Sequence, residues 1–205
     1  MSGPRRLIKW AIVAAGTAAL LYFFPLFHVI SLSHESKAEA FEPVAWVNRF
    51  WADKLIPASG QATSANDLIA AIRKSPQAAS EQYSRRVGLG GVYYYFVAGT
   101  GKIVSVDDDV VVELSDGTIS LVSGNVFGNA VRDGTGLLDV NDFPNSQHFN
   151  ALSSEINRRI EQNVLPTLRH AKVGASVRFV GCAEVMDEAA DLNPLRVVPF
   201  MAEVQ

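Results

Sequence analysis

An uninterrupted apolar run from Trp10 to Leu32 constrains this chain more than any other feature. The run contains no Asp, Glu, Lys or Arg. As a helix it would extend roughly 35 Å, enough to cross a hydrocarbon core of roughly 30 Å. A bilayer core offers no water to backbone amides, so such a segment must be helical there. The run therefore predicts one transmembrane helix that attaches the rest of the chain to a membrane.

The charges that flank this run predict its orientation. Arg5, Arg6 and Lys9 precede it without an acidic residue, whereas the residues that follow carry both signs. A basic excess in a short leading tail favours a cytoplasmic N-terminus. We therefore expect a single-pass protein of the bacterial inner membrane, with its soluble part in the periplasm.

A second interpretation of the same run is a secretory signal peptide that is removed after export. Ala38-Glu39-Ala40 has the A-x-A form of a cleavage site. It lies several residues beyond the apolar run, however, and the run is long for the hydrophobic part of a signal peptide. An uncleaved signal anchor is thus the preferred interpretation, and cleavage after Ala40 is the alternative.

Composition narrows the possible partners of the soluble part. The chain has a net charge of −3 although its first residues are basic, so the remainder is more acidic still. Proteins that bind nucleic acid usually carry clusters of Lys and Arg that contact the phosphates. An acidic soluble part therefore excludes nucleic acid as a partner. Cys182 is the only cysteine, which rules out an intramolecular disulfide. Its strand-like neighbours predict a small buried apolar residue, not a reactive thiol.

The soluble part divides into a tether and two folded regions. Residues 33–42 are small and polar, and residues 43–87 form a predicted three-helix subdomain. Pro43 and Pro76 suit the first position of a helix, while Ser64 and Ser75 suit the capping position before one. Between the first two helices, residues 59–64 read as a linker.

Residues 88–205 predict an OB-like domain, which makes the fold class α+β. Asp116-Gly117 marks a hairpin, Gly99-Thr100-Gly101 a tight turn or bulge, and Asn145 the cap of a long helix. The apolar β-branched stretches are Val92–Val97, Lys102–Val106, Val110–Leu114, Thr118–Val122, Ser176–Val185 and Leu195–Val204. Three or four strands, one helix and two strands is the order of an OB-type barrel, with the helix before the last two strands.

The densest polar stretch, Gly124 to Phe149, supplies the candidate site. Its candidate ligand- or partner-binding residues are Arg132, Asp133, Asn141, Asp142 and Asn145, whose side chains offer hydrogen-bond donors and acceptors. Tyr93, Tyr94 and Tyr95 are predicted to add a stacking surface, although ordinary strand packing is the alternative and alternation along a strand turns Tyr94 away from the other two. No calcium-loop, zinc or cofactor motif is present, so we predict no metal and no cofactor. The competing interpretation of the polar stretch is a structural loop.

Several short motifs in this chain resemble the DUF2291 family of predicted periplasmic lipoproteins. They are Phe41-Glu42-Pro43, Gly99-Thr100-Gly101-Lys102-Ile103-Val104, Gly124-x-Val126-x-Gly128-x-Ala130-x-Arg132-Asp133 and Asn141-Asp142-Phe143-x-Asn145. The resemblance implies a small helical region followed by an OB-like barrel. It also implies an accessory or binding role beside sugar ABC-type uptake systems. Many members carry a lipid-attachment cysteine, which this chain lacks after its apolar run.

The leading hypothesis is therefore a membrane-anchored, non-enzymatic periplasmic accessory or binding module. Its partners would be the inner membrane, through residues 10–32, and ABC transporter components or a sugar. One alternative is a periplasmic hydrolase that uses Asp133 or Asp142 with His148 as acid and base. Another is a structural envelope protein, which exposed aromatic residues at Trp46, Phe50 or Trp51 would favour.

Overall fold

The computed structural model describes residues 41–88 and 90–205. The predicted membrane segment Trp10–Leu32 and the tether that follows it lie outside the described residues, as does Leu89. Residues Phe41–Gln205 form one compact unit. Among the described helices, none combines the length and the apolar character needed to cross a membrane.

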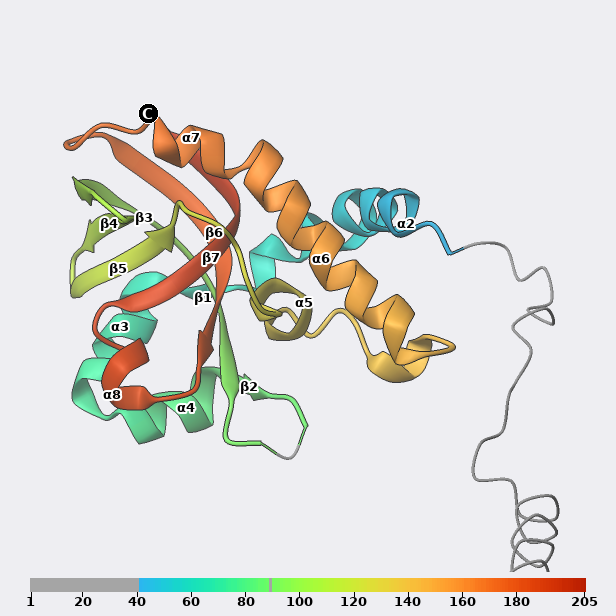
Figure 1. Ribbon diagram of the computed structural model, residues 1–205. Coiled ribbons are helices and arrows are strands. Elements are labelled where there is room, and N and C mark those ends of the chain that lie inside the picture. Colours follow the sequence, from blue (N-terminus) through green and yellow to red (C-terminus); the bar gives the residue numbers. More distant parts are fainter. Residues whose placement is uncertain (1–40, 89) are drawn as a thin grey trace, which may run out of the picture. The chain divides into compact units, whose positions relative to one another are not determined.

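The centre of this unit is a closed barrel (Figure 1). Its strands are β3 (Tyr93–Val106), β4 (Asp109–Leu114), β5 (Gly117–Val122), β6 (Ser176–Val185) and β7 (Leu195–Val204). They are hydrogen-bonded in the order β3-β4-β5-β7-β6, and β6 pairs back onto β3 to close the barrel. Strands β5 and β7 pair in parallel. The other barrel pairings, β3–β4, β4–β5, β6–β7 and β3–β6, are antiparallel. This is the OB-like arrangement expected from the order of strands and helix, and the α+β class is confirmed.

Strand β3 belongs to both halves of the barrel. Its pairing with β6 runs without a break from Tyr93 to Lys102, and its pairing with β4 runs from Lys102 to Val106. The turn or bulge predicted at Gly99–Gly101 is wrong, because the irregularity lies between Ile103 and Ser105. Gly101 instead allows β3 to approach the backbone of β4 closely. A Cβ at this position would lie 2.3 Å from the carbonyl oxygen of Glu113.

The helices that precede the barrel begin where the sequence predicts. They are α2 (Pro43–Phe50), which continues as a π-helical turn at Trp51–Leu55, and then α3 (Ala65–Lys74) and α4 (Pro76–Tyr83). Ser64 Oγ accepts a hydrogen bond from the amide of Asp67, and Ser75 Oγ accepts one from the amide of Ala78. Both predicted serine caps are therefore confirmed.

Two short strands appear where the sequence showed no strand signal. The predicted linker contains a 3-10 turn (Pro57–Gln61) followed by β1 (Thr63–Ser64), and α4 leads into β2 (Ser84–Arg86). β1 is parallel to β3 and β2 is antiparallel to it. These pairings tie the helical region to the barrel at its longest strand.

The helical region and the barrel share one hydrophobic core. Val47, Leu55 and Leu68 belong to the same buried cluster as Ile103 and Phe179 of the barrel. A second group of aromatic residues sits at this junction. Phe50 and Trp51 are buried, Trp46 is half-buried, and the guanidinium of Arg159 lies 4.8 Å from the centre of the Trp51 ring. The exposure of these rings that would favour the structural-envelope hypothesis is not seen for Phe50 and Trp51, whereas Trp46 stays half-buried.

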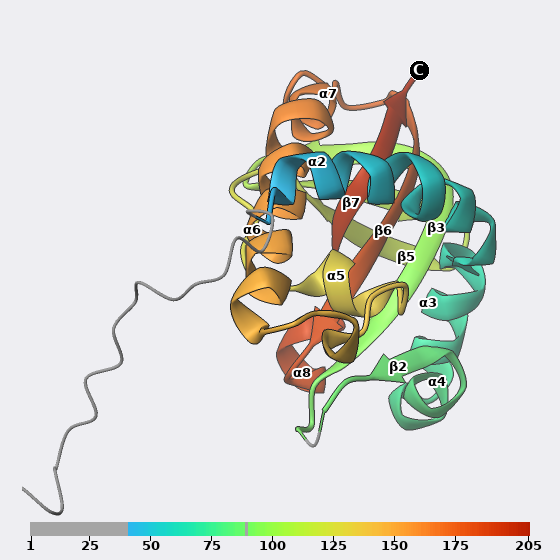
Figure 2. The same ribbon diagram turned by 90° about the vertical axis from the view of Figure 1, so that its right-hand side faces the viewer.

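The long helix α6 (Ser146–Asn163) is the element inserted before the last two barrel strands. Asn145 caps it by accepting a hydrogen bond from the amide of His148 at 2.9 Å, and its buried stripe is Phe149, Leu152, Ile156 and Ile160. Helix α6 lies beside α2 (Figures 1 and 2). The shorter helices of this part are α5 (Ala130–Gly134), α7 (Leu165–Arg169) and α8 (Glu188–Asp191).

Candidate functional site

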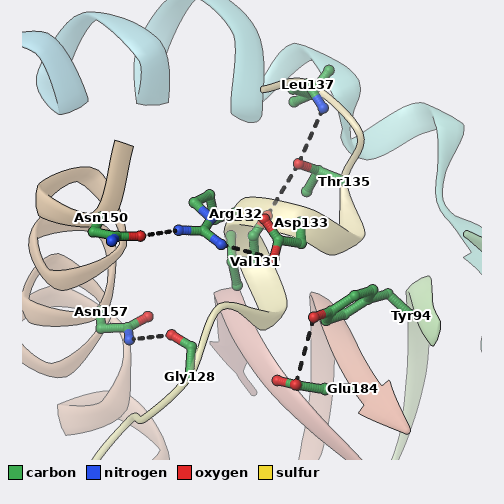
Figure 3. A network of polar contacts seen from close by, with 10 residues as sticks. All are labelled: Tyr94, Gly128, Val131, Arg132, Asp133, Thr135, Leu137, Asn150, Asn157 and Glu184. Carbon is green, nitrogen blue, oxygen red and sulfur yellow. Dashed lines mark hydrogen bonds and ion pairs between the residues drawn. The ribbon is translucent and has the colours of Figure 1, made fainter. Parts of the chain in front are cut away.

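Helix α5 carries a buried ion pair at the centre of the candidate region. The Arg132 and Asp133 side chains are only 8% and 7% exposed, and Nε lies 2.7 Å from Oδ1. A second bond joins Nη2 to Oδ2 at 2.9 Å, so the guanidinium and the carboxylate meet in a bidentate fork. Figure 3 shows this pair between α6 and the barrel. Each charge is compensated by the other, which is the condition for burying either.

Neighbouring side chains hold the guanidinium of Arg132 in place. Its Nη1 donates to Oδ1 of Asn150 on α6 at 3.2 Å (Figure 3). Its Cζ lies 4.1 Å from the centre of the Phe149 ring, a cation–π distance. The pair is therefore a fixed part of the packing between α5 and α6.

A second acid lies on the other side of the ion pair, on β6. Glu184 Oε1 accepts a hydrogen bond from the Tyr94 hydroxyl at 3.5 Å (Figure 3). Burial, followed by the negative charge of Asp133, raises the pKa of Glu184 above its usual value. Burial is likewise the main cause of a raised pKa at Tyr94. The site thus holds two different carboxylates. The charge of Asp133 is compensated by Arg132, whereas burial disfavours the charged form of Glu184.

A cleft of about 330 Å³ opens between β2, α5 and the loop that follows α5. We call it the arginine cleft. It is lined by Arg85, Arg86, Val87, Gly88, Arg132, Asp133, Leu138, Asp139, Val140, Asn141 and Phe149.

Arg85 and Arg86 bring positive charge to the arginine cleft, and Arg85 is the one that lies beside the loop after α5. Its guanidinium packs on the backbone at Gly136, where a Cβ would lie 2.7 Å from Nη1, and Gly136 has a φ of +69°. Arg86 is directed differently, because its Cζ lies 5.5 Å from the centre of the Tyr93 ring. Neither arginine forms an ion pair within the described part of the chain. Arg85 is therefore available to an acidic group that enters the cleft.

The arginine cleft brings together three of the predicted site residues, Arg132, Asp133 and Asn141. Asn141 lies in a 3-10 turn, and its Nδ2 donates to Oδ1 of Asp139 at 2.8 Å. Asp142 is exposed in the same turn, and Asn145 caps α6; neither of them lines the cleft.

The tyrosines of β3 do not form the predicted stacking surface. Tyr93, Tyr94 and Tyr95 are all buried. Tyr93 and Tyr95 meet edge to face with ring centres 5.5 Å apart, while Tyr94 faces Glu184. Because side chains alternate along a strand, Tyr94 was expected to face away from Tyr93 and Tyr95. The burial of all three side chains was not expected. The stacking prediction is therefore wrong.

The proposed acid–base pair lacks the geometry that a hydrolase would need. The ring of His148 stacks on Phe41 with centres 4.3 Å apart. No hydrogen bond joins it to Asp133 or Asp142 in the described part of the chain, and Asp133 is held by Arg132. Residues 41–88 and 90–205 contain no group of three or more His, Cys, Asp or Glu side chains placed to hold a metal.

The predicted role of Cys182 is confirmed. The residue is fully buried in β6, and burial raises the pKa of its thiol. Its thiol is therefore protonated and packed in the core, where it has no access to reactive partners.

Sequence comparison identifies the relatives of this chain. A family profile described as "Predicted periplasmic lipoprotein (DUF2291)" matches residues 17–203. The chain belongs to the DUF2291 family. The description of DUF2291 as periplasmic supports a location outside the cytoplasm. No curated protein matches the chain.

Structural comparison agrees with the observed barrel. A crystal structure of an OB-fold protein from Thermotoga maritima superposes with a TM-score of 0.72 at 23% sequence identity. The match covers 82% of this chain and 100% of that one. At this identity the likeness establishes the fold of this DUF2291 protein and leaves its ligand open.

Sequence reasoning missed Arg85, a charged group of the cleft that forms no ion pair within the described residues. The pair Arg85-Arg86 before the glycine run was the available signal. It could not be interpreted alone, because only the pairing of β2 with β3 brings Arg85 beside the loop after α5.

Proposed function

We propose that this DUF2291 protein is a membrane-anchored, non-enzymatic accessory module that docks onto a protein component of a sugar ABC-type uptake system. In this proposal residues 10–32 anchor it in the inner membrane, and the barrel works on the periplasmic side. The family's periplasmic description supports the compartment. The resemblance noted in the sequence analysis supports the link to transport.

The observation that carries the docking role is the make-up of the arginine cleft. Arg85 is exposed without an acidic partner in the described residues, and Val87 and Val140 expose 40% and 47% of their surface beside it. Arginine is enriched at protein interfaces, and apolar side chains with a polar rim are typical of them. The partner surface would present an Asp, a Glu or a C-terminal carboxylate to Arg85, which a guanidinium binds in bidentate fashion.

Photo-crosslinking in the native membrane tests this proposal. A photoreactive amino acid at Val140 of the full-length protein should capture a permease or a solute-binding protein. The control carries the same probe at Val173, which is 60% exposed and does not line the cleft. Arg85→Ala should remove the product at Val140. Capture of the same proteins from both positions, or of none from Val140, would contradict docking at the arginine cleft.

A further inference from the structure

A second concavity is formed by the loop before α5 and one face of α6. We call it the amide groove. It has a volume of about 490 Å³, within the range of roughly 300–1,000 Å³ that is usual for small-molecule sites. It is lined by Val126, Phe127, Gly128, Asn129, Asn150, Ser153, Ser154, Asn157, Arg158 and Glu161. The residues from α6 recur at three- and four-residue spacing, so they form one polar stripe along the helix.

The amides of this groove are oriented by the protein and still offer free hydrogen-bonding groups. Asn150 uses Oδ1 to accept from Arg132, and Asn157 uses Nδ2 to donate to the carbonyl of Gly128 at 3.0 Å (Figure 3). In the described structure Asn150 Nδ2 and Asn157 Oδ1 have no partner. One fixed donor and one fixed acceptor therefore remain, about two helical turns apart on the same face.

Ser153 lies between these two amides on α6 and adds a third polar group. It is 6% exposed, and its Oγ has no hydrogen-bond partner among the described residues. A buried hydroxyl without a partner is costly, and it calls for a group that supplies the missing bond. A ligand hydroxyl fits this set best, because it can donate and accept through the same oxygen.

Arg158, the one basic side chain among the groove residues, is already engaged. Arg158 donates from Nε to Glu155 at 2.7 Å and from Nη1 to Gln162 at 2.6 Å. Glu161 accepts from the amide of Val126 at 2.8 Å. An anionic ligand would find no unpaired positive charge here, whereas the Glu161 carboxylate can also accept a hydrogen bond from a ligand hydroxyl.

Phe127 supplies an apolar surface at the groove. Its side chain is 80% exposed, the highest exposure of any large apolar residue in the described chain. An exposed ring beside a groove is free to contact a molecule that binds there. The ring can cover the C–H face of a cyclic ligand while the amides bind its hydroxyl groups.

We propose that the amide groove binds a neutral polyhydroxylated ligand, a saccharide of one or two rings. Phe127 would cover one face of a ring, and Asn150, Ser153 and Asn157 would bond hydroxyls. This site is separate from the docking surface at the arginine cleft. Neither proposal needs the other.

The test is a binding screen of the full-length protein, purified in nanodiscs, against an array of neutral mono- and disaccharides. Hits are quantified by isothermal titration with the wild type and matched variants. Phe127→Ala and Asn157→Ala should each weaken the affinity about tenfold or more, since each removes a contact worth roughly 1.4 kcal/mol. Met186→Ala removes a 72% exposed apolar side chain away from the groove, and Asn163→Ala removes an amide from α6 outside it. Both controls should bind within about twofold of the wild type.

The proposal is overturned if the array yields no saccharide, or if affinity falls equally in the controls. Binding of peptides or anions that depends on Phe127 would also overturn it, because the groove would then serve another class of ligand. Melting curves of all variants separate lost binding from lost folding. The screen contains no partner protein, so its failure leaves the docking proposal standing, and failed crosslinking leaves the saccharide proposal standing.

Discussion

Arg132 holds its charge in the protein interior, and its surroundings explain how. The bidentate bond to Asp133, the bond to Asn150 and the ring of Phe149 replace the water that the guanidinium would have outside. The polar composition of the segment marked Arg132 and Asp133 as candidate binding residues. Their burial adds a structural role, so the loss of either would disturb packing and binding together.

The first prediction concerns this ion pair. Arg132→Ala should lower the free energy of unfolding by about 3–5 kcal/mol, because it leaves the Asp133 carboxylate buried and unpaired. The double variant Arg132→Met, Asp133→Leu should lose much less, since no charge then remains buried. Urea denaturation measures all three proteins.

The control for the ion pair is Arg178→Ala, which breaks a surface pair whose side chains are 59% and 52% exposed. It should cost less than about 1 kcal/mol. Equal losses for Arg132→Ala and Arg178→Ala would contradict the buried-pair account.

The second prediction follows from the raised pKa of Glu184. The unfolded chain loses this proton near pH 4.5, whereas the folded chain keeps it to higher pH. The unfolding free energy contributed by Glu184 is therefore fully present below pH 4.5 and is lost as pH rises through the folded pKa. Glu184→Gln should remove this part of the pH dependence, so the variant gains stability relative to the wild type between pH 4 and pH 7. Denaturation curves of both proteins at pH 4 and pH 7 test this prediction. It is contradicted if the difference in unfolding free energy between variant and wild type is the same at the two pH values.

Among the elements, β3 depends on glycines at points of close contact. Gly101→Ala would place a Cβ 2.3 Å from the Glu113 carbonyl and 2.6 Å from Val112 Cγ1. Backbone atoms cannot yield cheaply, so we expect a loss of about 1–3 kcal/mol in unfolding free energy. Gly124→Ala is the matched control, because a Cβ there meets nothing within 4 Å. Its effect should stay within about 0.5 kcal/mol, and similar effects at both positions would contradict the role given to Gly101.

Elements with a local signal were predictable, and those that depend on distant partners were not. The caps Ser64, Ser75 and Asn145 act over a few residues, and each was confirmed. Strands β1 and β2 exist only because β3 offers them an edge. Helix α5 is similarly short, and its polar segment read as a loop.

The candidate site was only partly predictable for the same reason. Its polar segment was found, but the arginine cleft needs β2, and the amide groove needs α6 beside the loop at Phe127. The polar stripe of α6 was visible in the sequence. Its role was not, because only the fold shows which face of the helix is covered.

For the whole molecule, the anchor and its orientation give a direct prediction. Alkaline phosphatase fused after Gln205 should be active, and green fluorescent protein fused there should stay dark, because the proposed topology puts the C-terminal part in the periplasm. Deleting residues 10–32 should abolish phosphatase activity and membrane sedimentation together. Active phosphatase without that segment would contradict its role in export. Intact mass measurement of the exported protein then distinguishes a retained anchor from cleavage after Ala40.

The double pairing of β3 also decides when the barrel can be completed during synthesis. From Tyr93 to Lys102 one side of this strand is bonded solely by β6, which begins at Ser176. Until the ribosome has delivered that segment, a row of backbone amides and carbonyls stays open to other chains. In a nascent chain that ends before Ser176, the sheet therefore has an unpaired edge on β3 and the apolar interior of the barrel is not yet covered. The barrel therefore cannot close before synthesis has passed Ser176, and β3 is the barrel strand that waits longest for its partner.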